Sequence, residues 1–178
     1  MKTNPSRLSL VCGLGGALLM SAAPLAQAAD ADVLPATGDK VETFISTKYW
    51  TVFKNNTRQS CFIEWRAENS VVQAGLTLDQ NAGYLGAFLK DADPQAGDQD
   101  VAIVLNGNVY VGSATTVSGE LSGGLKGGYI VVDNPRFLTD LEEAREFVAF
   151  QGAPYTVTVK LKTPKNAVER ARECMTTF

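Results

Sequence analysis

The stretch that decides the fold is Lys48-Tyr49-Trp50-Thr51-Val52-Phe53, followed after a short gap by Ser60-Cys61-Phe62-Ile63-Glu64-Trp65. Aromatic and β-branched residues dominate both runs, which favours β-strands. Between them lies Asn55-Asn56-Thr57, a cluster of residue types that favour turns. Alternate residues of the second run point to opposite faces, beginning with Cys61 on one face and Phe62 on the other. The stretch therefore predicts a β-hairpin.

This hairpin is also rich in large aromatic side chains. Because successive residues of a strand point to opposite faces, these side chains cannot all enter one core. Some of them are therefore expected to form an exposed binding patch or to line a cleft, whereas the alternative is a core on both faces of the sheet. The candidate patch consists of Tyr49, Trp50, Phe53, Phe62 and Trp65.

Working outward from the hairpin, further apolar or alternating runs predict more strands, each bounded by turn residues. Asn106-Gly107 separates two of them and is typical of a two-residue hairpin turn, in which both residues need positive φ. The repeated glycines from Gly119 to Gly128 predict a flexible connection. The predicted strands are Val71 to Leu78, Ala82 to Leu89, Val101 to Leu105, Val109 to Val111, Tyr129 to Val132 and Tyr155 to Leu161, with Thr115 to Leu121 as a further candidate.

A first helix is predicted from a capping signal late in the chain. Thr139-Asp140-Leu141-Glu142 fits a capping box, with Thr139 as the N-cap and Glu142 reaching back to it. Leu141, Ala144 and Val148 would then share one face, and Gly152 and Pro154 would end the helix.

A second helix is predicted after Thr163-Pro164, with Thr163 as the cap and Pro164 at the first helical position. Ala167, Ala171 and Cys174 recur at helical spacing and make one apolar stripe. Cys174 is therefore expected to face the body of the protein.

Together these elements predict a mainly β fold with two helices, of the α+β class. Hairpin spacing with few long crossovers favours an antiparallel β-sandwich or barrel, with helices packed against it. One β-rich domain is expected over 47–178. The preceding segment, 29–46, is weakly patterned and broken by Pro35 and Gly38, so it is expected to be a flexible lead-in.

The first 28 residues have the three parts of a cleavable signal peptide. Lys2 and Arg7 make a positive start, Leu8 to Met20 is apolar, and Ala26-Gln27-Ala28 offers small residues at a cleavage site before Ala29. The pattern predicts export to the periplasm or the exterior, with no transmembrane segment left after cleavage. An uncleaved membrane anchor is the alternative.

Cleavage changes both the charge and the cysteine count. Without Lys2 and Arg7, 14 basic side chains stand against 19 acidic ones, which gives a net charge of −5. This acidic balance argues against nucleic acid as a partner. Of three cysteines, only Cys61 and Cys174 remain, and in an oxidising compartment such a pair is expected to form a disulfide that ties the last helix to the sheet.

The chemistry available to the chain is narrow. It has no histidine, which removes the usual general base and the commonest metal ligand. No cofactor and no metal are therefore expected, and the acidic segment 91–100 is interpreted as a solvated loop, with calcium the one ion to test. Glu64 lies mid-strand between aromatic residues, which a salt bridge or a solvent-facing position would explain. A carboxylate-based hydrolase remains an alternative to a non-enzymatic protein.

The order of Lys48-Tyr49-Trp50-Thr51-Val52, Cys61-Phe62, the strand and turn Val101 to Gly107, Leu161 and Cys174 resembles the invasion-associated locus B family of alphaproteobacterial exported proteins. That family shows a Trp-x-Val strand, a Cys soon after it, and a late Leu-Gly-Phe element before a helix that ends in Cys. The similarity spans Lys48 to Cys174, but Thr163-Pro164-Lys165 replaces the Gly-Phe element.

The resemblance implies a non-enzymatic protein of the bacterial envelope or exterior, and some members of the family are linked to host-cell invasion. No catalytic residues carry over. The expected partner is another protein or an envelope component. Inhibition of a hydrolase through a projecting loop, for which 91–100 is the candidate, is a further alternative.

Overall fold

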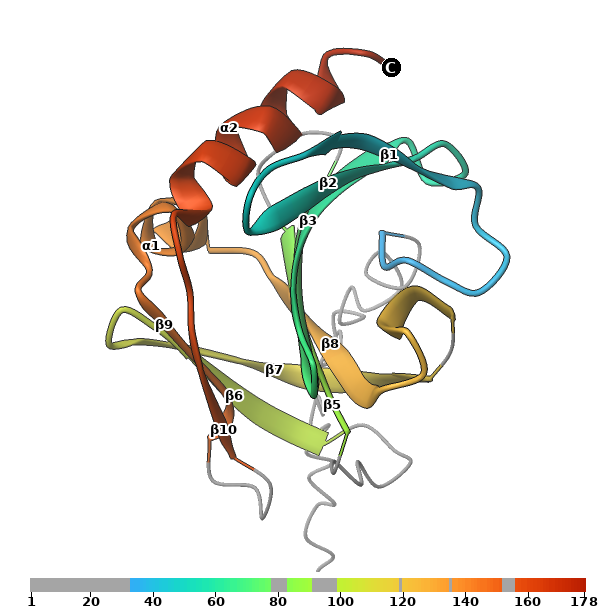
Figure 1. Cartoon of the computed structure of the whole chain (residues 1–178). Helices are drawn as coiled ribbons and strands as arrows, with labels where there is room; N and C mark the ends of the chain where they lie inside the picture. The colour runs from blue at the N-terminus through green and yellow to red at the C-terminus, as the bar shows by residue number, and fades with distance from the viewer. Residues whose placement is uncertain (1–32, 78–82, 91–98, 119, 135, 152–155) are drawn as a thin grey trace, which may run out of the picture.

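The computed structural model describes residues 33–77, 83–90, 99–118, 120–134, 136–151 and 156–178. Antiparallel strands dominate these residues, with two α-helices and one short 3-10 helix (Figure 1). The elements in chain order are β1 Val41–Ser46, β2 Trp50–Asn55, β3 Ser60–Ala67, β4 Ser70–Leu76, β5 Gly83–Leu89, β6 Gln99–Leu105, β7 Asn108–Ser118, η1 Glu120–Ser122, β8 Lys126–Val132, α1 Arg136–Glu143, β9 Glu146–Gln151, β10 Val157–Lys160 and α2 Pro164–Met175.

The strands are hydrogen-bonded in the order β1-β2-β3-β4-β5-β8-β7-β6-β9-β10, and every neighbouring pair is antiparallel. The long strand β7 joins two halves, because it pairs with β6 along 108–114 and with β8 along 115–118. The array bends there, so that β6, β9 and β10 face the half that contains β2 to β5 (Figure 1). The predicted mainly antiparallel β fold with two helices is confirmed.

The larger of two hydrophobic clusters, here called the inner core, fills the space between the two halves and the helices. Alternation supplies it: Val52, Ile63 and Leu85 point inward from the first half, and Phe147 points inward from β9. All four are at most 1% exposed. Both helices add to this core, and α2 contacts β2 and β3 directly.

A second cluster, here called the outer core, lies on the opposite face of β3, β4, β5 and β8. It contains Leu34, Phe62, Val71, Tyr84, Phe88 and Tyr129. Figure 1 shows the helices on one side of these strands, and the N-terminal segment and η1 on the other. These strands are therefore buried on both faces, which explains why apolar residues occupy both alternating sets in β3 and β5.

Part of the segment 29–46, which was expected to be a flexible lead-in, belongs to the sheet. Val41–Ser46 forms β1, an edge strand that pairs with β2 through a bulge between Thr43 and Ile45. Leu34 is buried in the outer core. Pairing with β2 makes 41–46 a strand although its own sequence pattern is weak. Residues 29–32 lie outside the described residues.

The first predicted helix is wrong in its boundaries. The helix α1 begins at Arg136, so Thr139 lies inside it, and the amide of Arg136 donates to the Asn134 side chain at 3.0 Å. The helix ends at Glu143, and Glu146–Gln151 forms β9. Phe147 and Ala149 alternate into the inner core, so the two-residue period outweighed the helical spacing of Leu141, Ala144 and Val148.

The second helix is as predicted, from Pro164 to Met175, with Ala167, Ala171 and Cys174 buried. Thr163 has positive φ and makes no side-chain cap hydrogen bond, so only its position was predicted correctly. The expected flexible connection is also shorter than predicted, because Gly127 and Gly128 belong to β8 and pair with Phe88 and Ala87.

Candidate functional site

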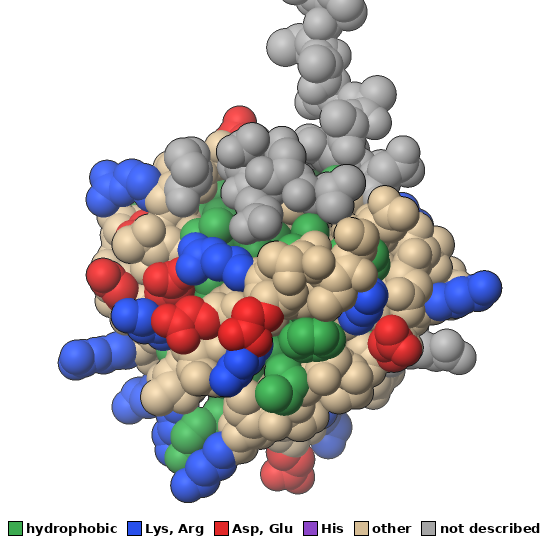
Figure 2. Space-filling view, turned by 90° about the horizontal axis from the view of Figure 1, so that it is seen from above, with side chains coloured by type: hydrophobic (Ala, Val, Ile, Leu, Met, Phe, Trp, Pro, Cys, Tyr) green, Lys and Arg blue, Asp and Glu red, His purple; other side chains and the backbone are tan. Residues whose placement is uncertain are grey.

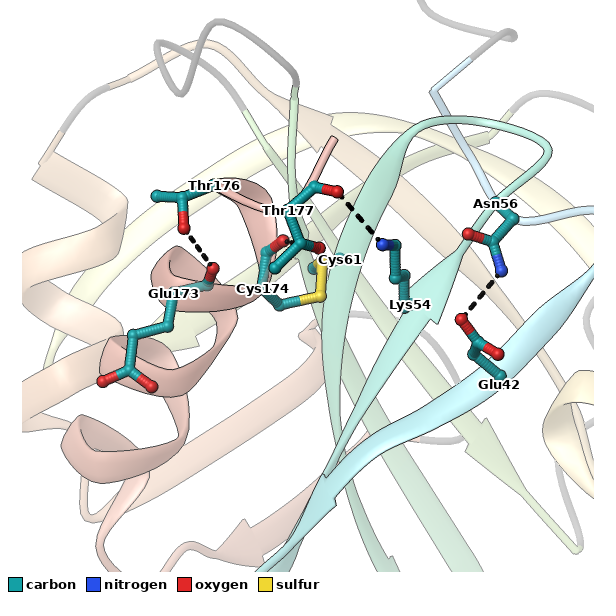
Figure 3. The surroundings of a disulfide bond; sticks show 8 residues. All are labelled: Glu42, Lys54, Asn56, Cys61, Glu173, Cys174, Thr176 and Thr177. Atoms are coloured by element: carbon teal, nitrogen blue, oxygen red, sulfur yellow. Dashed lines mark hydrogen bonds between the residues drawn. A yellow bond between two sulfur atoms is a disulfide. The ribbon is translucent and has the colours of Figure 1, made fainter.

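The predicted disulfide is present and ties α2 to β3. Cys61 and Cys174 are bonded, with their Cα atoms 6.1 Å apart, and both are fully buried (Figure 3). The C-terminal residues add two contacts nearby: the Thr177 hydroxyl donates to the Cys174 carbonyl at 2.7 Å, and the Lys54 ammonium donates to the Thr177 carbonyl at 3.3 Å. Burial removes both sulfurs from solvent, which suits a structural bond.

The five aromatic residues of the predicted patch do not form one exposed surface. Trp50 is 2% exposed, Phe62 is 1% exposed, and the other three are partly buried. Tyr49, Trp50 and Trp65 pack with the inner core, whereas Phe53 and Phe62 pack with the outer core. The five side chains thus pack on both faces of the sheet, as in the alternative of a two-sided core.

Two of these side chains make specific contacts. The Trp50 indole nitrogen donates to the Lys162 carbonyl at 2.6 Å, which holds the chain just before α2 against β2. The rings of Phe53 and Phe62 stack with their centroids 5.1 Å apart. The first contact joins β2 to the residues before α2, and the second joins β2 to β3.

Buried polar side chains lie against the outer core, and we take this face of the sheet as the candidate site. Gln73, which is fully buried, lies at its centre. Its amide nitrogen donates to Glu64 at 2.7 Å and to the Leu121 carbonyl at 3.0 Å, and its amide oxygen accepts from the Tyr129 hydroxyl. Arg66 pairs with Glu64 at 2.9 Å. Glu64 is thus a salt-bridged carboxylate, as one of the sequence interpretations held.

Aromatic rings cover two glycines of this face. The ring of Tyr84 lies where a Cβ on Gly75 would stand, and the ring of Tyr129 would lie 2.5 Å from a Cβ on Gly86. The two tyrosine rings meet edge to face at 5.4 Å. Burial raises the pKa of Tyr84, with Tyr129 and Asp39 adding to the shift, so its hydroxyl stays protonated.

The N-terminal residues close the other end of the same face. Asp39, whose side chain is 4% exposed, accepts from the Ala36 amide at 2.9 Å, from the Asn55 side chain at 2.7 Å and from Arg58 at 3.1 Å. Burial acts to raise the pKa of Asp39, but the hydrogen bonds from Asn55, Ala36 and Arg58 outweigh it, and the net pKa is lowered.

Other polar and apolar features lie elsewhere. Asp140 of α1 accepts from the Tyr110 hydroxyl and from Asn108 at 2.8 Å, which fastens the helix to the β6–β7 hairpin. Burial and this hydrogen bond raise the pKa of Tyr110.

A cavity between β3, β4 and the helices measures about 10 Å³, room for roughly one water molecule. Val109 and Val111 on β7 are 57% and 68% exposed.

Charged side chains of both signs are interspersed on the face shown in Figure 2, with hydrophobic side chains in small separate groups. Among the described residues, three or more potential metal ligands nowhere gather into a group. Asp91, Asp93 and Asp98 of the acidic segment lie outside the described residues. Within the described ranges, neither helix has the length and apolar character needed to cross a bilayer.

No family model, no curated protein and no solved structure matches this chain. The assignment of residues to the candidate site is therefore based on the contacts and burial described above.

Sequence reasoning singled out Glu64 and Phe62 from this site and missed Asp39, Gln73, Tyr84 and Tyr129. Gln73 carries a usable signal, because it is a polar residue inside the apolar run Val71 to Leu76. The glycines on either side of Tyr84, at Gly83 and Gly86, are a second signal, since strand glycines often mark a close approach. Asp39 was missed because two of its three partners, Asn55 and Arg58, come from β2 and the turn after it.

Proposed function

We propose that this chain is an exported protein of the bacterial envelope or exterior that acts by binding another molecule. The observation that carries the proposal is the buried Cys61–Cys174 disulfide. Such bonds form and persist in oxidising compartments, and the residues before Ala29 have the pattern of a cleavable leader.

Binding is proposed in place of catalysis because the buried carboxylates in the described part of the chain are already engaged within the fold. Glu64 is held by Gln73 and Arg66, Asp140 by Tyr110 and Asn108, and Asp39 by Arg58 and its neighbours. A general acid or nucleophile needs a carboxyl group that faces substrate. Membership of the invasion-associated locus B family, proposed from the spaced sequence pattern, agrees with a binding role.

Export is tested by expressing the full chain in a Gram-negative host and measuring the intact mass of the protein in the periplasmic fraction. We expect an N-terminus at Ala29 and no free thiols before reduction. The matched control is Leu18→Arg, which breaks the apolar run and should leave the precursor in the cytoplasm. A protein that keeps Met1 in the envelope fraction, or that has two reactive thiols, would refute export with cleavage.

Binding is tested by immobilising the mature protein and exposing it to envelope extract and to host-cell extract. We expect one or few species to be retained in a saturable manner and identified by mass spectrometry. A panel of glycoside and peptide substrates, assayed with the same preparation, tests the carboxylate-hydrolase alternative. Turnover that is lost in Glu64→Gln but kept in Glu169→Gln would favour that alternative over binding.

A further inference from the structure

Residues 33–40, here called the strap, lie on the outer core without belonging to a strand. Leu34 is 6% exposed and is the residue that the strap contributes to the buried cluster. Figure 1 shows this segment on the side of the sheet opposite the helices. The strap thus covers one end of an aromatic face that the folded sheet builds on its own.

The far end of the strap is held by polar contacts. The Asp39 carboxylate accepts from Arg58 and from Asn55 of β2. Beyond it, the Lys40 amide donates to Thr57 at 2.8 Å, and the Asn56 amide donates to the Lys40 carbonyl at 2.9 Å. Asp39 is therefore the latch between the strap and the turn that follows β2.

The face beneath keeps two hydroxyl groups without hydrogen-bond partners among the described residues, those of Tyr84 and Ser60. Tyr84 is fully buried and Ser60 is 3% exposed. Both point to the outer face, because Ser60 alternates with Phe62, and Tyr84 pairs with Gly75 beside Phe62. Unpaired buried hydroxyls are costly and rare, so a ligand that accepts hydrogen bonds from these two groups would remove that cost.

We propose that the strap is a releasable cover on a peptide-binding face, and that an extended acidic and apolar peptide segment of a partner takes its place. The strap itself defines this chemistry. An apolar side chain would fill the Leu34 position, a carboxylate would pair with Arg58, and backbone carbonyls would accept from Tyr84 and Ser60. The inference rests on the proposed function, namely that the chain acts by binding.

Release of the strap leaves the rest of the fold intact. The inner core, both helices and the disulfide lie on the opposite face of β3. Opening therefore requires the loss of the Leu34 contacts, the Asp39 bonds and the hydrogen bonds of Lys40 with Thr57 and Asn56, a local event of the kind that precedes global unfolding. The strap and a partner compete for the same face. The apparent affinity for the partner is therefore the affinity of the open form multiplied by the fraction of molecules that are open.

The test uses the mature chain, Ala29 to Phe178, and a fluorescent peptide with the sequence Val33-Leu34-Pro35-Ala36-Thr37-Gly38-Asp39-Lys40. Binding is measured by fluorescence anisotropy for the wild type and for Asp39→Asn, Leu34→Ala and Arg58→Gln. Asp39→Asn and Leu34→Ala loosen the strap in two different ways and should each bind the peptide about tenfold more tightly than the wild type. Arg58→Gln also loosens the strap but removes the site for the peptide carboxylate, so it should gain little.

Circular dichroism melts establish that each variant is folded, and hydrogen exchange should show faster exchange in 36–40 of Asp39→Asn with unchanged protection in β9. A peptide with Asn in place of its aspartate should lose most of the gain. Equal peptide affinity for wild type, Asp39→Asn and Leu34→Ala would overturn the proposal, as would Arg58→Gln binding as tightly as Asp39→Asn.

These outcomes are separate from those of the proposed function. Export, cleavage and capture of a partner are measured without the peptide, so they can succeed while the strap fails its test. In that case the partner binds another surface. If Asp39→Asn captures the partner more strongly than the wild type does, the captured partner binds the face that the strap covers.

Discussion

The inner and outer cores lie on opposite faces of the same strands, yet they are held by different forces. The inner core joins apolar residues from both halves of the sheet and both helices, and the Cys61–Cys174 bond closes it. The outer core is smaller and contains a polar network around Gln73 and a latch at Asp39. One face is thus fastened covalently and the other by hydrogen bonds and charge.

This difference bears on which face can change. Apolar burial and a disulfide depend little on pH or on competing ligands, whereas a carboxylate latch depends on both. The outer face is also covered by a short segment, 33–40, that belongs to no strand. The packing of the inner core is therefore expected to be insensitive to pH and ligands, whereas the cover of the outer core is expected to respond to both.

The largest expected effect comes from the inner side. Replacing both half-cystines, in Cys61→Ala with Cys174→Ala, should lower the free energy of unfolding by about 2–5 kcal/mol, because the bond closes a loop of more than 100 residues. Chemical denaturation followed by circular dichroism measures it. Reductant should lower the stability of the wild type by a similar amount and leave the double variant unchanged. Equal stability of the two proteins would show that α2 is held by packing alone.

The polar network of the outer core should give the next largest effect. Gln73→Leu leaves the buried Tyr129 hydroxyl without its partner and leaves Glu64 with Arg66 alone, and it should cost about 2–3 kcal/mol. Tyr129→Phe removes a single hydroxyl and should cost only about 1 kcal/mol. Denaturant melts of the two variants compare them. If Gln73→Leu proves neutral, the network contributes nothing to stability.

The same contrast explains what the sequence predicted well. The inner core depends on period: Cys61, Ile63 and Trp65 alternate on β3, and Ala167, Ala171 and Cys174 recur on α2, so the disulfide and the antiparallel β class could be predicted. The leader remains a prediction, since 1–32 lies outside the described residues.

The outer core depends on contacts that period does not encode. Asp39 meets Arg58 across 19 positions, and Tyr129 meets Gln73 across 56. One segment of the inner core, Glu146–Gln151, shows the same limit. It was predicted as helix because Leu141, Ala144 and Val148 fit a helical stripe, but hydrogen bonds to β6 made it a strand, in which Phe147 and Ala149 alternate into the inner core. Long-range pairing decided both cases.

A smaller, pH-dependent effect should appear at the latch. The pKa of Asp39 is lowered in the folded state, so its contribution to stability is complete above the unfolded pKa of about 3.9 and is lost as the pH falls through the folded value. Melting temperatures measured between pH 6 and pH 2 should therefore fall more steeply for the wild type than for Asp39→Asn. Asp133→Asn, at an exposed position, is the matched control and should follow the wild type. Parallel curves for Asp39→Asn and the wild type would contradict the latch.

The smallest effect should come from the hydroxyl of Tyr84, and its sign is the informative part. In the closed state this hydroxyl is buried and unpaired among the described residues, while the ring covers Gly75 and meets Tyr129. Tyr84→Phe keeps the ring and removes the unpaired group, so it should raise the free energy of unfolding by up to about 1 kcal/mol. Denaturant melts measure this change, and Tyr129→Phe, which removes a paired hydroxyl from the same face, should change stability in the opposite direction. A loss of stability in Tyr84→Phe would mean that an internal water already satisfies the hydroxyl. The outer face would then be complete in its closed state, and the strap would act as a fixed part of the fold.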